Sequence, residues 1–394
     1  MKALSYSEQR AIISRCIKND LHLGDELRRL GCEYESLRYE YNAATRGVQP
    51  NFIKFEALPR LSPRIPLVSF FSGCGGLDLG FEAAGFEHLT LVDNNELACT
   101  TLRSNRPTWN VLGPPDCDGD VSQREAVRSS LIRLGIKSPF EGIFVGGPPC
   151  QPFSIAANQR FSKNGRNFKR IGFLDLARGN LLFDFIWFIK ELRPTAFLVE
   201  NVPGLLAIDR GEQMVQAIRE LTECGYFVTG PQLIEASNYG VPAQRQRLFI
   251  IGCRHNRLLL LPQGNGKKVP CGAVLSPSLN GVQNHVTREH SASSIARYML
   301  LKYGERDHLG RVDRLDPNLP SKTVIAGGTR GGGRSHLHPV IPRTLSVREC
   351  ARLQTFPDWY VFYGAVARQF TQVGNAVPPK LAYEMATAIA KFYF

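Results

Sequence analysis

Residues 66–252 alternate short β-rich runs with helical stretches, and this alternation narrows the choice of fold more than any other feature. The β-rich runs are LVSFF, LTLVD, GIFVGG, TAFLVEN and RLFIIG, while GNLLFDFIWFIKELR and GEQMVQAIRELTECG have the apolar spacing of helices. Strands and helices in alternation build a largely parallel sheet with helices on both faces. We therefore predict an α/β fold for this part of the chain.

The remaining sequence divides into three segments around that fold. Residues 1–60 show helical spacing in EQRAIISRCI and GDELRRLGCEYESLRYEY and contain no motif that indicates a chemical function. Residues 253–342 are rich in Gly and Pro, basic and less periodic, which indicates a second, smaller domain. Residues 343–394 are predicted to open with a helix capped by Ser346 and to close with a helix over PPKLAYEMATAIAKFYF.

The net charge of +13 is concentrated in two places. Residues 253–342 carry thirteen Lys or Arg against five Asp or Glu, and residues 156–170 add five basic residues with no acidic one. A solvated basic face explains either segment alone, but two of them in one chain favour a polyanionic partner, most simply nucleic acid.

The sequence predicts a soluble protein of the cytoplasm without a metal site. The apolar run LLFDFIWFI is interrupted by Asp184 and is too short to span a membrane. The ten cysteines are scattered with no CxxC pair, so no zinc or disulfide framework is expected and each is considered alone. His336 and His338 have no third ligand nearby in the sequence.

A Gly-rich turn and two carboxylates describe a pocket for an adenosine group. The run FFSGCGGLDLGFEAAGF places Gly73 and its neighbours in a turn between strand and helix, where a ligand can approach the backbone. Asp93 ends the next strand, where doubly wound folds hold ribose hydroxyls. Asp120 could reach an adenine amino group from the following strand end. The alternatives are an ordinary tight turn and, for Asp120, a surface cap.

Cys150 is the candidate nucleophile. It follows Pro148 and Pro149 at the end of a strand predicted to be buried, where open α/β sheets bind ligands and two prolines stiffen the loop. Two other strand ends present Glu200 and, at alternate positions, Arg245 and Arg247. A buried, inert thiol is the alternative for Cys150. For Glu200 the alternative is a structural ion pair with one of the arginines.

Six motifs in order make the chain resemble the DNA (cytosine-5) methyltransferases of prokaryotic restriction–modification systems. They are FFSGCGGLDLGFEAAGF, GGPPCQPFS, ENV, QRQR, RECARLQTFPD and QVGNAVPP. The resemblance implies a Rossmann-like, S-adenosylmethionine-dependent methyltransferase domain at 66–252 and a target-recognition domain at 253–342. Residues 343–394 would return to the catalytic domain, and residues 1–60 would be a helical N-terminal extension.

The resemblance also implies a role for each residue of the motifs. Cys150 would add to carbon 6 of cytosine, Glu200 would serve N3, Arg245 would hold O2, and Arg247 would support the loop or the pair. The expected cofactor-binding residues are Phe71, Gly73, Gly75, Gly76, Asp93, Asp120, Val121, Asn375 and Val377.

The expected substrate is double-stranded DNA with the target cytosine flipped out of the helix. Expected DNA contacts are Gln151, Ser154, Lys163, Arg166, Lys169, Thr323, Arg330 and Arg334. Arg330 and Arg334 flank three glycines, as guanine-reading or phosphate-binding arginines would. We expect a monomer associated with the bacterial nucleoid and a restriction endonuclease as functional partner.

Three other functions share part of this pattern. A tRNA cytosine-5 methyltransferase carries the same motifs, although the large basic insert favours DNA. An inactive DNA-binding relative would lack the Pro-Pro-Cys or Glu-Asn-Val residues, which are present. A dinucleotide oxidoreductase fits the first turn alone.

Overall fold

The computed structural model describes residues 4–42, 54–61, 64–149, 181–275, 279, 281–309, 312–326 and 336–394, without the side chains of residues 208–210. By packing, the chain forms two compact units. One comprises residues 1–56, 240–245 and 267–375, and the other comprises residues 57–239, 246–266 and 376–394. We call the first the recognition unit and the second the sheet unit. The four segments expected from the sequence stay a prediction about functional domains.

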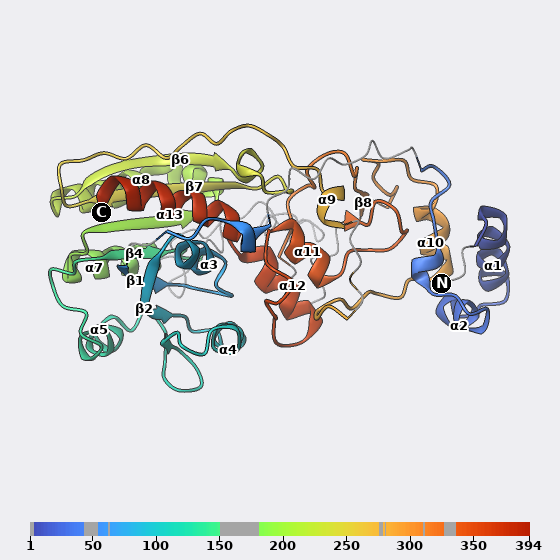
Figure 1. Ribbon diagram of the computed structural model, residues 1–394, viewed down its shortest axis with the longest axis horizontal. Helices are drawn as coiled ribbons and strands as arrows, with labels where there is room; N and C mark the ends of the chain where they lie inside the picture. The colour runs from blue at the N-terminus through green and yellow to red at the C-terminus, as the bar shows by residue number, and fades with distance from the viewer. Residues whose placement is uncertain are drawn as a thin grey trace. The chain divides into compact units, whose positions relative to one another are not determined.

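The sheet unit is built on a seven-stranded sheet (Figure 1) in the order β3-β2-β1-β4-β5-β7-β6. The strands are β1 Ile65–Phe70, β2 Phe86–Val92, β3 Val111–Leu112, β4 Ile143–Gly146, β5 Ala196–Asn201, β6 Phe227–Glu235 and β7 Gln246–Cys253. Pairs among β1 to β5 are parallel, whereas β7 runs antiparallel to both β5 and β6. The predicted α/β class and largely parallel sheet are confirmed.

Helices cover both faces of this sheet. On one face, alternate residues such as Phe70, Phe144 and Phe197 join a buried core with α5 Arg124–Arg133, α7 Leu181–Leu192 and α8 Glu212–Glu223. The intervening residues Leu67 and Val145 are fully buried as well. Parallel strands buried on both sides need a second helical layer, because side chains alternate between the two faces.

The first and last helices of the sheet unit pack against each other. They are α3 Gly76–Ala83 and α13 Pro379–Tyr393, which lie side by side in Figure 1. Gly80 permits the contact, because a Cβ there would lie 2.3 Å from the Cβ of Ala382 and 2.6 Å from the carbonyl oxygen of Pro379. Among the described residues of this unit, the remaining α-helix is α4 Glu96–Asn105.

The recognition unit contains short helices and little sheet. Its helices are α1 Tyr6–Lys18, α2 Leu23–Arg29, α9 Gly272–Leu275, α10 Ala292–Tyr298, α11 Val347–Leu353 and α12 Val366–Asn375. Two short strands, β8 Asp313–Arg314 and β9 His336–Leu337, pair in parallel. Ser346 caps α11 as predicted, because its side chain accepts a hydrogen bond from the amide of Glu349.

Candidate active site

The glycine turn after β1 has the backbone that its sequence requires. Gly73 and Gly75 have φ values of +54° and +78°, and Gly75 is the N-cap of α3. Phe71 also has a positive φ of +55°, which costs free energy in a residue with a side chain. Gly76 is the first residue of α3. The space beside Gly73 is open, since the nearest atom to a Cβ placed there lies 4.0 Å away.

Asp93 lies against this turn, as the adenosine-pocket prediction requires. Its Oδ2 accepts a hydrogen bond from the Gly73 amide at 2.7 Å, and its Oδ1 accepts one from the Asn95 amide at 2.8 Å. Burial raises the pKa of this carboxyl, while the two backbone donors act in the opposite direction. The arrangement holds a carboxylate rigidly at the carboxyl end of β2, beside open space.

Two glycines that the sequence analysis missed allow the third strand to approach Asp93. A Cβ on Gly113 would lie 2.1 Å from the carbonyl oxygen of Asp93, and one on Gly119 would lie 2.2 Å from it. Their positions in the sequence were the available signal, since Gly113 directly follows the short β3 and Gly119 is the glycine of the DGD run.

Asp120 and Val121 lie in the turn before α5. Asp120 Oδ1 accepts hydrogen bonds from the amide and the hydroxyl of Ser122, at 3.0 and 2.8 Å, as a turn-capping residue does. The side chain of Val121 packs into the core of the sheet unit, so an adenine contact from this residue would come from its backbone. The predicted roles of both residues stay predictions.

Asn375 and Val377 fall on opposite sides of the boundary between the two units. Asn375 is the exposed last residue of α12 in the recognition unit, and Val377 is buried just before α13 in the sheet unit. Their predicted contacts with the cofactor stay predictions.

Glu200 and Arg247 form a buried ion pair. Glu200 lies opposite Phe249 in the antiparallel pair of β5 and β7, and Arg247 lies two residues before Phe249, on the same face of the sheet. Arg247 Nε is 2.7 Å from Glu200 Oε1, and about a tenth of each side chain is exposed, 10% and 11%. The ion pair that the sequence analysis considered for Glu200 is therefore present, and its partner is Arg247.

The Pro-Pro loop is bonded to the neighbouring strand β5, next to this carboxylate. Asn201 Nδ2 donates a hydrogen bond to the carbonyl oxygen of Pro148 at 3.3 Å. A Cβ on Gly147 would lie 2.9 Å from Glu200 Oε2, so only glycine fits without moving the carboxylate. Glu200 Oε1 thus lies near the arginine and Oε2 near the backbone three residues before Cys150.

Arg245 differs from the sequence-based expectation, which placed it beside Arg247 on one strand. The strand β7 begins at Gln246, so Arg245 lies before it. Its guanidinium is fully buried and donates hydrogen bonds to the carbonyl oxygens of Val324 at 3.1 Å and Gly374 at 2.7 Å. Its predicted contact with the cytosine O2 stays a prediction.

Eight of the predicted site residues lie outside the described part of the chain. They are Cys150, Gln151, Ser154, Lys163, Arg166, Lys169, Arg330 and Arg334. Thr323 is described and exposed, and its hydroxyl donates a hydrogen bond to the carbonyl oxygen of Gln244 at 2.8 Å.

Most described cysteines are poor candidates for a nucleophile. Burial raises the pKa of six thiols, which favours the unreactive protonated form; these are Cys16, Cys74, Cys99, Cys253, Cys271 and Cys350. The described residues contain no cluster of three His, Cys, Asp or Glu side chains suited to a metal ion. None of the helices in the described ranges has the length and apolar character of a membrane span.

A largely parallel sheet with an open glycine turn after its first strand and a buried Glu–Arg pair beside a Pro-Pro loop is typical of α/β enzymes. The family model of C-5 cytosine-specific DNA methylases matches residues 65–271 and 275–391. The chain belongs to this family.

Named relatives agree with that assignment. The Type II methyltransferase M.PspPI of Psychrobacter sp. is 33% identical over 82% of this chain and 79% of its own length. The Type II methyltransferase M.NgoFVII of Neisseria gonorrhoeae is 32% identical over 83% of this chain and 87% of its own length. A solved structure of a candidate DNA modification methyltransferase from an E. coli prophage is 26% identical, with a TM-score of 0.63 over 83% of this chain and 99% of that one.

Proposed function

We propose that this chain transfers a methyl group from S-adenosylmethionine to carbon 5 of a flipped-out cytosine in a specific duplex DNA sequence. The observation that carries the proposal is the position of Glu200, which lies between Arg247 and the backbone of Gly147. A carboxylate fixed beside Gly147, which precedes Cys150 by three residues, suits proton transfer at a cytosine that the cysteine attacks.

The turn after β1 fits S-adenosylmethionine. The Asp93 carboxylate, held by two amides, is suited to ribose hydroxyls, and the open space beside Gly73 leaves room for a ligand against the backbone. Phe71, Gly75 and the start of α3 would line the remainder of this site. The bound cofactor supplies an electrophilic methyl group.

The chain's own residues would make the cytosine reactive. Carbon 5 is a poor nucleophile until the Cys150 thiolate forms a bond to carbon 6 and the ring's electron pair moves toward N3. Glu200 would hold or donate the proton at N3, and Arg247 would keep the carboxylate oriented. Carbon 5 would then take the methyl group as the bond from methyl to sulfur breaks, which leaves S-adenosylhomocysteine. Loss of the carbon 5 proton to a base and elimination of the thiolate would restore the aromatic ring.

We further propose, from the names of the relatives, that the protein modifies DNA in a restriction–modification system with a partner endonuclease. It would act as a monomer in the cytoplasm, on the nucleoid. Light scattering during size-exclusion chromatography measures the mass in solution and so tests whether the protein is a monomer.

Methylation assays on duplex DNA and on tRNA, each followed by bisulfite sequencing, test the function and its tRNA alternative. We expect methylated cytosines in one recurring sequence of the duplex. Methylation confined to tRNA would establish the alternative, and methylation of neither would refute both.

A mechanism-based trap tests the covalent step. Duplex DNA with 5-fluorocytosine at the target should form an adduct that survives denaturation, because fluorine cannot leave as the proton does. Cys150→Ala should lose the adduct and the turnover, whereas Cys117→Ala, which changes an exposed cysteine, should keep both. Full turnover by Cys150→Ala would exclude covalent catalysis by this residue.

A further inference from the structure

Residues 4–42 are packed into the recognition unit, although they precede the residues that the family model matches. Leu27 and Leu37 from this extension share one buried core with Ile295 of α10 and Leu337 of β9. Because burial of such side chains is a main source of folding free energy, the extension is an integral part of this core.

Polar contacts fix the end of the extension to the segment that follows β9. The hydroxyl of the buried Tyr39 donates a hydrogen bond to the carbonyl oxygen of His338 at 2.8 Å. The fully buried Arg314 lies 3.5 Å from the centre of the Tyr39 ring. Its guanidinium donates to the carbonyl oxygens of Tyr41 at 2.6 Å and Pro339 at 2.7 Å. One buried cation therefore joins both segments.

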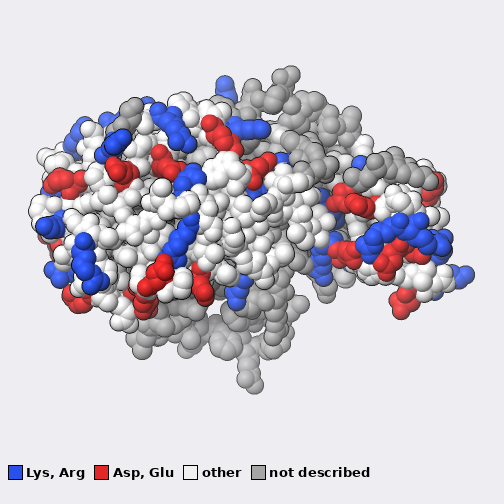
Figure 2. All heavy atoms as spheres, turned by 60° about the horizontal axis from the view of Figure 1, so that its bottom comes forward, with Lys and Arg blue, Asp and Glu red and all other residues white. Residues whose placement is uncertain are grey.

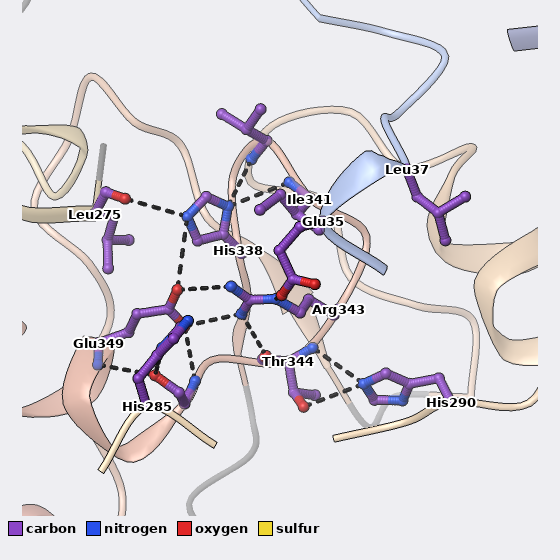
Figure 3. A network of polar contacts seen from close by, with 12 residues as sticks. Glu35, Leu37, Leu275, His285, His290, His338, Ile341, Arg343, Thr344 and Glu349 are labelled. Atoms are coloured by element: carbon purple, nitrogen blue, oxygen red, sulfur yellow. Dashed lines mark hydrogen bonds and ion pairs between the residues drawn. The ribbon is translucent and has the colours of Figure 1, made fainter. Parts of the chain in front are cut away.

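A second arginine connects the same two segments (Figure 3). Arg343 donates to Glu35 Oε1 at 3.1 Å and to the two carboxylate oxygens of Glu349 at 2.8 and 2.9 Å. Although burial alone would raise the pKa of Glu349, Arg343 holds it at about 2, so the carboxylate stays charged. Beside it, the His338 ring accepts hydrogen bonds from the amides of Val340 and Ile341, both at 3.2 Å.

The segment held in this way begins at a residue that contacts a predicted DNA-binding residue. Nε2 of His336 lies 3.0 Å from the carbonyl oxygen of Thr323, and His336 pairs with Asp313 in the parallel sheet of β8 and β9. Residues 34–42 are therefore coupled through residues 336–344 to the backbone of Thr323.

The charge of the extension argues against a direct role in DNA binding. Residues 4–42 carry six Lys or Arg and seven Asp or Glu, a net charge of −1, in a chain whose net charge is +13. Figure 2 shows basic and acidic side chains intermixed at the end where Figure 1 places α1 and α2. A surface that binds phosphates would be predominantly basic.

We propose that residues 34–42 are a positioning element of the recognition unit that determines how strictly the protein discriminates its DNA sequence without contacting DNA. They fix residues 336–344, and this segment fixes Thr323. The inference rests on the proposed DNA methylation.

Two mild substitutions test this role. Tyr39→Phe removes the hydrogen bond to His338 but keeps the ring against Arg314. Glu35→Gln removes the negative charge that faces Arg343. Tyr6→Phe is the matched control, because the hydrogen bond that its hydroxyl makes among the described residues, to Glu40 at 3.0 Å, is exposed and stays within the extension. All three are made in the full chain.

The measurement is the ratio of methylation at the preferred sequence to methylation at single-base variants, in a randomised duplex library read by bisulfite sequencing. Loss of one hydrogen bond in Tyr39→Phe, and loss of the negative partner of Arg343 in Glu35→Gln, should each lower this ratio about two- to tenfold. The affinity for S-adenosylhomocysteine and the melting temperature should stay near the parent's, and Tyr6→Phe should match the parent throughout.

An unchanged ratio in both variants would overturn the inference. A uniform loss of methylation at every sequence, together with a lowered melting temperature, would also overturn it, because that result indicates a merely structural role. A parent protein that methylates no duplex DNA would refute the proposed function, and the inference would fall with it. A selective parent with equally selective variants would refute the inference alone.

Discussion

Asp93→Asn should weaken cofactor binding with little effect on DNA binding. The carboxylate uses both oxygens to accept backbone amides, from Gly73 at 2.7 Å and Asn95 at 2.8 Å. An asparagine has one acceptor oxygen, so its NH₂ group would face one of these N–H donors. The ribose hydroxyls would also lose a charged acceptor, which is worth about 1.5 to 3 kcal/mol, or roughly 10- to 150-fold in Kd.

Isothermal titration with S-adenosylhomocysteine measures the cofactor side, and fluorescence anisotropy with labelled duplex measures the DNA side. Asp116→Asn is the matched control, because Asp116 is an exposed carboxylate in the same unit, paired with Arg103. Equal weakening of both ligands by Asp93→Asn would indicate a folding defect, and unchanged affinity for S-adenosylhomocysteine would refute the assignment of Asp93 to the ribose.

Gly73→Ala separates the turn from the carboxylate. A Cβ at position 73 meets no protein atom closer than 4.0 Å, so the substitution leaves Asp93 in place. It penalises the backbone φ of +54° and places a methyl group in the space proposed for the ligand. If this variant binds S-adenosylhomocysteine as weakly as Asp93→Asn, the turn rather than the carboxylate determines the affinity.

Two further predictions concern buried charges. Glu200→Gln and Arg247→Gln should each lower the free energy of unfolding by up to about 3 to 5 kcal/mol, measured by urea titration. The double variant should lose less than the sum of the two single losses. Additive losses would mean that the two side chains do not interact. Burial lowers the pKa of His338 from 6.5 to about 4, so the ring is neutral in the folded protein. As the pH falls from 6.5 to 4, only the unfolded chain gains this proton, and stability should fall by about 3 kcal/mol in total. His338→Gln should lack this loss of stability between pH 6.5 and 4, whereas the control His308→Gln, which changes an exposed histidine, should retain it. If NMR showed that His338 of the folded protein titrates near pH 6.5, the reasoning would be wrong.

The sequence predicted the parts of the fold that depend on local pattern. All five predicted β-rich runs became strands, because continuous apolar runs are typical of strands that are buried on both faces of a sheet. The strand β6 was missed, because it is an edge strand, is largely half-buried or exposed, and contains Gly230 and Pro231 at a shift in its register with β7. Patterns based on burial are weakest at such an edge.

The candidate site was predicted where motif and strand end coincide. The contact between Gly73 and Asp93 follows from two adjacent parallel strands ending at one edge. The pairing of Glu200 with Arg247 depended on the register of β5 and β7, and the carbonyl partners of Arg245 lie 79 and 129 residues away along the chain. Such long-range partners leave no trace in local spacing.

Each unit is assembled from segments that are far apart in the sequence, and this affects how the protein folds during synthesis. The α3 helix is closed by α13, and the core of α1 and α2 is completed by residues near 295 and 337, so each unit waits for segments translated much later. At about 5 to 20 residues per second, residues 76–83 leave the ribosome roughly 15 to 60 seconds before α13 does. During that interval the nascent chain exposes an apolar helix face, so ribosome-associated chaperones should bind it until α13 has been synthesised.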